Sequence, residues 1–78
     1  MYFKRLKDIR EDNNLSQTKI AQILNMKQQQ YSRYENGTNE IPFEYIIKLA
    51  EFYNVPIDYL AELTDISEPY KRKKIKQN

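Results

Sequence analysis

The sequence predicts an all-α domain of five short helices, and three features of the chain indicate this fold class. Apolar residues recur every three or four positions over most of the chain, which is the spacing of one helical face. β-Branched residues are few and never alternate over a useful length, so no strand is expected. Asn, Gly and Pro residues separate the periodic segments and mark their ends. With 78 residues, the chain suffices for one small domain.

The composition argues against several classes of protein. The chain has no Cys, which excludes a disulfide scaffold and a thiolate metal site, and no His, which removes the usual general base. We therefore expect neither an enzyme nor a metal, cofactor or small-molecule site. Charges begin at Lys4, and no segment approaches the roughly 20 apolar residues of a membrane helix. These features predict a cytoplasmic protein without a signal peptide or a membrane partner.

The net charge of +2 conceals an uneven distribution. Residues 1–39 carry seven basic and four acidic side chains, a net charge of +3. Residues 40–70 carry one basic and seven acidic side chains, a net charge of −6, and residues 71–78 carry +5. This pattern indicates that a polyanion approaches the first half of the chain.

The first two predicted helices are separated by Asn13-Asn14. The first covers about residues 2–12, and its apolar face carries Phe3, Leu6 and Ile9. Ser16 is expected to cap the second helix, whose apolar face carries Ile20, Ala21 and Leu24. Lys19 stands where a capping box would have Glu or Gln. A cation in the first turn opposes the helix dipole, so an anion is expected nearby.

A sharp turn is predicted between the second and third helices. Asn25 suits a left-handed backbone conformation there, and Met26 is expected to fill the space under the turn. The third helix covers about residues 27–35, with Tyr31 and Tyr34 facing inward. Asn36-Gly37 ends it.

Two proline residues mark the starts of the last two helices. Pro42 suits the first turn of the fourth helix, and Asn54 suits its C-cap. The apolar stripe of the fourth helix is expected to contain Phe43, Ile46, Leu49, Ala50 and Tyr53. Pro56 opens the fifth helix. Its inward residues are expected to be Ile57 and Leu60, with Leu63 near its end.

The predicted domain covers residues 1–66, followed by a basic tail at 67–78. The tail has no apolar periodicity and is expected to be flexible. Its cluster of Lys and Arg side chains either adds non-specific affinity for DNA or only improves solubility.

Two short helices joined by a tight turn and followed by Asn-Gly form the pattern of a helix-turn-helix. The segments that carry it are LSQ at 15–17, IA at 20–21, LNM at 24–26 and YSRYENG at 31–37. With the apolar positions of 46–60, they make residues 3–65 resemble the lambda-repressor-like family of bacterial and phage regulators, also called the XRE or Cro/CI family. The resemblance implies a compact five-helix DNA-binding domain with its third helix in the major groove.

Candidate base-contacting residues lie on the third helix. With the two tyrosines inward, its outer face presents Gln28, Gln29, Ser32 and Arg33. Gln pairs well with adenine and Arg with guanine, each through two hydrogen bonds. The resemblance implies base contacts at Gln28, Gln29 and Arg33, and Lys27 is placed to reach a base or a phosphate. Without the surrounding pattern, the glutamines would instead indicate a solvated helix face that makes no contact.

Candidate phosphate contacts lie at the start of the second helix and after the third. The first group is Ser16, Gln17 and Lys19, and the second is Asn36, Thr38 and Asn39. The resemblance implies the contact of Gln17, whereas for Ser16 capping alone is favoured over a direct contact. It also implies a structural ion pair between Arg10 and Glu35. The acidic residues of the first helix, interleaved with Lys7 and Arg10, are interpreted as a solvated charged face.

One such module contacts only a few base pairs, so a palindromic operator on double-stranded DNA is expected. Two half-sites would lie about 34–36 Å apart and require a homodimer. We expect that homodimer to form through about residues 57–68. Because no effector domain is visible, a repressor that blocks a promoter is the favoured interpretation. The alternative is a protein-binding adaptor or antitoxin-like partner that works through the acidic residues of 40–68.

Overall fold

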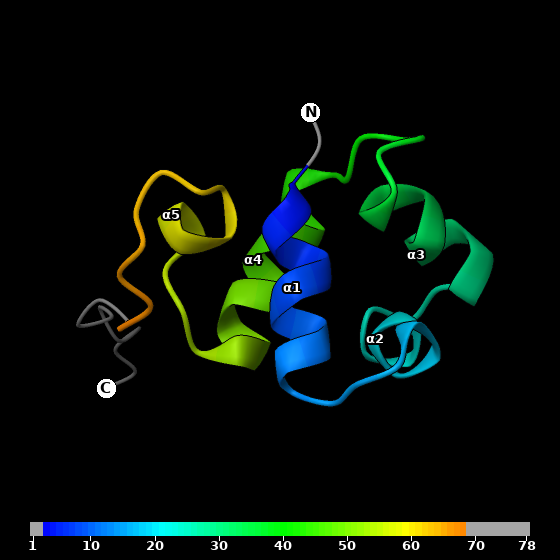
Figure 1. Ribbon diagram of the computed structural model, residues 1–78. Coiled ribbons are helices and arrows are strands. Elements are labelled where there is room, and N and C mark those ends of the chain that lie inside the picture. The colour runs from blue at the N-terminus through cyan, green and yellow to red at the C-terminus, as the bar shows by residue number, and fades with distance from the viewer. Residues whose placement is uncertain (1–2, 69–78) are drawn as a thin grey trace, which may run out of the picture.

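The computed structural model describes residues 3–68 and contains five α-helices in this part of the chain. They are α1 (Lys4–Asp12), α2 (Gln17–Ile23), α3 (Gln28–Glu35), α4 (Phe43–Tyr53) and α5 (Ile57–Leu60). Figure 1 shows α1 in the middle of the molecule, with α2 and α3 on one side and α5 on the other. The prediction of an all-α domain is confirmed.

The core takes apolar side chains from every helix. The side chains that are almost completely inaccessible are Leu6, Ile20, Leu24, Tyr31, Leu49 and Leu60. Burying one side chain of this size contributes about 1.5–3 kcal/mol before the conformational entropy is subtracted. Because Tyr31 and Tyr34 are both buried, α3 is attached to the core along one face, as predicted, and its opposite face is left for solvent.

Four helices end in the same way. Asn14, Asn25, Asn54 and Glu62 adopt left-handed conformations with φ of 57°, 59°, 57° and 61°. In each case the next residue donates its N–H to a carbonyl five positions earlier, as in a Schellman motif; Met26 N to Ala21 O is 2.9 Å. Asn tolerates this conformation better than other residues with a side chain. The prediction for Asn25 is confirmed.

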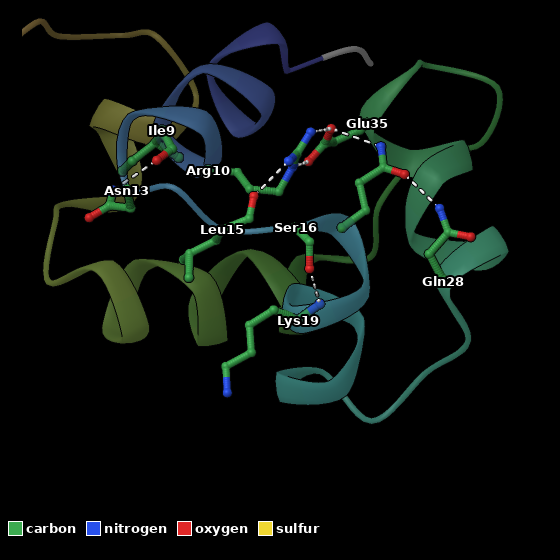
Figure 2. Close-up of polar contacts among 9 residues, drawn as sticks. Ile9, Arg10, Asn13, Leu15, Ser16, Lys19, Gln28 and Glu35 are labelled. Carbon is green, nitrogen blue, oxygen red and sulfur yellow. Dashed lines mark hydrogen bonds and ion pairs between the residues drawn. The ribbon is translucent and has the colours of Figure 1, made fainter.

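The start of α2 also agrees with prediction. The Ser16 hydroxyl accepts a hydrogen bond from the Lys19 backbone N–H at 3.0 Å, as Figure 2 shows. An N-cap of this kind satisfies one of the backbone donors that the first helical turn leaves without a partner.

Two predictions about the later helices were wrong. Phe43 is 64% exposed, because Ile41, just before the helix, fills the core at this end. The second concerns α5, which ends at Leu60 rather than near Leu63. Its Schellman turn at Glu62 directs the chain away from the helix axis, and Leu63 is 77% exposed. Pro42 and Pro56 are N-caps with extended ψ of 146° and 151°, one residue before the expected first turn.

Arg5 attaches α1 to the segment after α5, a contact that the sequence analysis did not anticipate. Its guanidinium donates to the carbonyl oxygens of Tyr59 (3.1 Å) and Thr64 (2.9 Å) and to the Asp65 carboxylate (2.9 Å). It also lies over the Tyr59 ring, 4.3 Å from the centroid. The first helix therefore holds the end of the described chain in place.

Two sequence predictions bear on other parts of the chain. Most of the predicted basic tail, from residue 69 onward, lies outside the described residues. Across residues 3–68, no helix has the length and apolar character needed to cross a bilayer.

Candidate nucleic-acid interface

The outer face of α3 carries the predicted base-contacting residues. Gln29 and Arg33 are exposed, and neither side chain has a hydrogen-bond or ion-pair partner among the described residues. Lys27 is the N-cap of α3, exposed and without a side-chain cap bond. Gln28, the first residue of the helix, is half-buried. Lys27, Gln28 and Gln29 therefore lie at the start of α3, and Arg33 lies in its last turn, on the same side of the helix as Gln29.

A row of hydrogen bonds connects α1, α2 and α3. Arg10 Nε donates to Glu35 Oε2 at 2.6 Å, and Arg10 Nη2 donates to Glu35 Oε1 at 3.0 Å. Gln17 Nε2 donates to the same Oε1 at 3.1 Å, and Gln28 Nε2 donates to Gln17 Oε1 at 2.7 Å. Figure 2 shows the Arg10–Glu35 pair and Gln28 at the two ends of this row.

The Arg10–Glu35 ion pair is buried, with side-chain exposures of 11% and 2%. Burial works to raise the pKa of Glu35, but the hydrogen bonds from Arg10 and Gln17 outweigh it and hold that pKa below its ordinary value of 4.5. Arg10 Nη1 also donates to the Leu15 carbonyl at 2.8 Å. Four segments of chain therefore share one charged, hydrogen-bonded cluster.

This row determines how Gln28 is presented. One Nε2 hydrogen is used by Gln17, which leaves the second Nε2 hydrogen and the Oε1 atom of Gln28 without partners. One donor and one acceptor side by side are the groups that a glutamine needs to pair with adenine. From the sequence, Gln17 and Gln28 are separate candidates for a phosphate contact and a base contact. In the structure a hydrogen bond connects the two side chains.

The candidate phosphate-contacting residues form two groups. At the start of α2, Ser16 is occupied as a cap, while the Lys19 ammonium is exposed and makes no described contact. After α3, Asn36 Oδ1 accepts from the Thr38 N–H at 2.9 Å and from the Thr38 hydroxyl at 2.6 Å. Asn39 is exposed and donates its backbone N–H to Arg33 O.

A hollow of about 200 Å³ lies between these groups and is lined by Lys7, Gln17, Glu35 and Asn36. We call it the α1–α2–α3 hollow. The charge pattern of α1 predicts a solvated charged face for Lys7. The available signal was its spacing, because Lys7 precedes Arg10 by three residues and therefore lies on the same side of α1.

A helix-turn-helix family model matches residues 6–60, which include all five helices except the first two residues of α1. The chain belongs to this XRE-type helix-turn-helix family. In this family assignment, α2 and α3 are the two helices of the motif, and Asn25 occupies the turn between them.

Similar proteins include several regulators. The chain is 31% identical over 78 residues to an uncharacterized HTH-type transcriptional regulator, YobD, of Bacillus subtilis, covering 99% of this chain and 70% of that protein. It is 36% identical over 76 residues to the cryptic phage CTXphi transcriptional repressor RstR of Vibrio cholerae, covering 97% of this chain and 66% of that protein. It is 33% identical over 63 residues to antitoxin PezA of Streptococcus pneumoniae, covering 80% of this chain and 40% of that protein.

The family assignment directs attention to α3 rather than to a metal or catalytic site. Within residues 3–68, no three His, Cys, Asp or Glu side chains are grouped as metal ligands. The described carboxylate with the most specific surroundings is Glu35, and both of its oxygens accept hydrogen bonds from other side chains.

Proposed function

We propose that this protein is a sequence-specific double-stranded DNA-binding transcriptional regulator that contacts bases in the major groove with α3. The observation that carries the proposal is the division of α3 into two faces. Tyr31 and Tyr34 are buried on one face, while Gln29 and Arg33 are exposed on the other. Gln28 stands beside them, oriented by its hydrogen bond from Nε2 to Gln17.

The chemistry of this face suits base edges. The major groove admits an α-helix, and residues at the start of that helix reach the bases. Arg33 lies one turn after Gln29 on the same side of α3. Gln28 and Gln29 suit adenine, and Arg33 suits the O6 and N7 atoms of guanine. Lys27 at the N-cap of α3 suits a base or an adjacent phosphate.

The two groups of polar residues flanking α3 suit the DNA backbone. Contacts to phosphates fix the position of the protein on the duplex without specifying sequence. One group is Ser16, Gln17 and Lys19, and the other is Asn36, Thr38 and Asn39. Lys19 weakens an isolated helix by its place in the first turn of α2, and a neighbouring phosphate would compensate for this effect.

Two further features of the proposal concern assembly and mode of regulation. The segment 57–68 carries the exposed side chains of Leu63 (77%) and Ile66 (66%), which supports self-association there on a palindromic operator. The similarity to a phage transcriptional repressor supports repression by blocking a promoter. Sedimentation of the duplex complex tests assembly: a single protomer on an intact palindrome would contradict the homodimer.

A second candidate function is suggested by the similarity to an antitoxin. In this case the acidic residues of 40–68 would contact a protein partner, and DNA binding would be secondary. The two candidates differ in what α3 contributes, because an antitoxin-like partner does not require base contacts by Gln29 and Arg33.

The test is selection of bound duplexes from a random DNA pool, followed by variants of α3. Gln29→Ala and Arg33→Ala should each reduce discrimination between the selected duplex and single-base variants by about 1–3 kcal/mol. Gln22→Ala, at an exposed position on α2, serves as the matched control. The proposal is refuted if no sequence is enriched, or if both α3 variants discriminate as well as the parent protein.

A further inference from the structure

The α1–α2–α3 hollow has a wall that the proposed function does not use. Lys7 lies on α1, outside the helix-turn-helix itself, yet it lines the same hollow as Gln17 and Asn36. Its ammonium has no ion-pair or hydrogen-bond partner among residues 3–68. The hollow, at about 200 Å³, is several times the roughly 30 Å³ that a water molecule occupies in the liquid.

The donors around the hollow are fixed by bonds on their other side. Asn36 Oδ1 accepts twice from Thr38, so the orientation of the Asn36 amide is determined and its Nδ2 group keeps two free N–H donors. Gln17 Nε2 spends one hydrogen on Glu35 and keeps the other. Two residues that line the hollow therefore keep unused amide N–H donors, and hydrogen bonds fix the orientation of both amides before any ligand arrives.

The charges around the hollow favour an anion. Glu35 is the acidic member of its lining, but Arg10 neutralises that carboxylate through two hydrogen bonds of 2.6 and 3.0 Å. Lys7 then adds a positive charge without a counter-ion. A cation with several N–H donors suits an anion that has more than one acceptor oxygen, such as a phosphodiester group.

We infer that Lys7, with Asn36 and Gln17, binds one backbone phosphate of the DNA and so acts as a positioning residue for α3. The inference rests on the proposed function and extends the backbone contact to α1. Since Gln17 also orients Gln28, a phosphate bound to Gln17 in the hollow is connected through that one residue to the proposed base-contacting side chain of Gln28. Lys7 thereby helps to set the register of the protein on the duplex.

The test compares Lys7→Gln with Lys4→Gln, which removes the same charge from another exposed position one turn earlier on α1. Binding to the enriched duplex and to a scrambled duplex is measured at several salt concentrations. The slope of log K against log salt is negative, and loss of one phosphate contact in Lys7→Gln should make it less negative by about 0.9. The same loss also weakens binding to both duplexes by a similar factor, and Lys4→Gln changes the slope less.

A second variant tests the amide donors without disturbing the turn. Asn36→Asp keeps the acceptor for Thr38 but replaces the Nδ2 donors with a carboxylate oxygen, so it should weaken binding to both duplexes more than Lys7→Gln. An unchanged slope in Lys7→Gln, or an equal change in Lys4→Gln, overturns the inference while leaving the proposed function intact. If the parent protein prefers no duplex, the proposed function fails and the phosphate assignment fails with it.

Discussion

Replacing Arg10 with Met should reverse the pH dependence that Glu35 contributes to stability. In the parent protein the pKa of Glu35 lies below its ordinary value of 4.5. Its stabilising contribution is therefore complete above about pH 4.5 and is lost as the pH falls through the lowered value. Without Arg10, burial of a side chain that is only 2% exposed dominates, and the pKa of Glu35 should rise above 4.5. The contribution then disappears as the pH rises.

The size of the effect follows from the burial and the bonds. Removing one partner of a buried ion pair costs about 3–5 kcal/mol. The low end is expected because Glu35 keeps its hydrogen bond from Gln17 and is able to take up a proton. A chain of this length has a total stability of about 4–12 kcal/mol, so the loss is a large fraction of the whole. Between about pH 5 and pH 7, the difference between variant and parent should grow by up to 1.4 kcal/mol per unit.

The assay is urea unfolding at several pH values, followed by the circular dichroism of the helices. Subtracting the unfolding free energy of the variant from that of the parent protein cancels the contributions of the other titrating groups. Arg10→Lys is the control, because it keeps the charge but loses the two-pronged geometry, and it should lose less stability. If Arg10→Met is itself unfolded, Arg10→Lys still tests the bond geometry. A loss below about 1 kcal/mol, or a variant whose deficit shrinks as the pH rises, would refute the reasoning.

Three smaller predictions are checked by the same unfolding measurement. Ser16→Ala should cost about 1 kcal/mol through loss of the cap on α2, whereas Ser16→Asn should be nearly neutral. Asn25→Val should cost about 1–2 kcal/mol of stability, because valine disfavours the left-handed conformation with φ of 59° at this position. Asn25→Gly is the comparison, and equal stability of the two variants would contradict this account. Tyr31→Phe should cost less than about 1 kcal/mol, because the buried Tyr31 hydroxyl makes no hydrogen bond of standard geometry, although it is near enough to Glu35 to help lower the pKa of that carboxyl. A loss above about 1 kcal/mol would mean that this hydroxyl donates to Glu35 in solution.

Local features of the fold were predictable, because their causes lie within a few residues. Asn25 and Ser16 act on backbone groups no more than five positions away, so the sequence contains what determines them. Phe43 was misplaced because its exposure depends on Ile41 filling the core first, which is a matter of three-dimensional packing. The spacing of apolar residues in the sequence does not show whether Phe43 or Ile41 fills this part of the core.

The candidate site was predictable residue by residue but not as a connected whole. The residue types on α3 and its resemblance to known regulators indicated which side chains to consider. The hydrogen bonds from Gln28 to Gln17 and from Gln17 to Glu35 join positions 11 and 18 residues apart, and no local pattern announces them. The position of Lys7 beside Gln17 and Asn36 likewise depends on a hollow that three helices form together, whereas its spacing from Arg10 indicates only its side of α1.

The contacts of Arg5 have a consequence for the order of folding events. They join residues 54, 59 and 60 positions apart, so nearly the whole described chain must be arranged before they form. The α2–α3 pair depends on shorter loops and is expected to assemble earlier, because closing a long loop costs more entropy. Interactions that are absent from the folding transition state affect mainly the unfolding rate. The contacts of Arg5 should therefore slow unfolding and leave the folding rate almost unchanged.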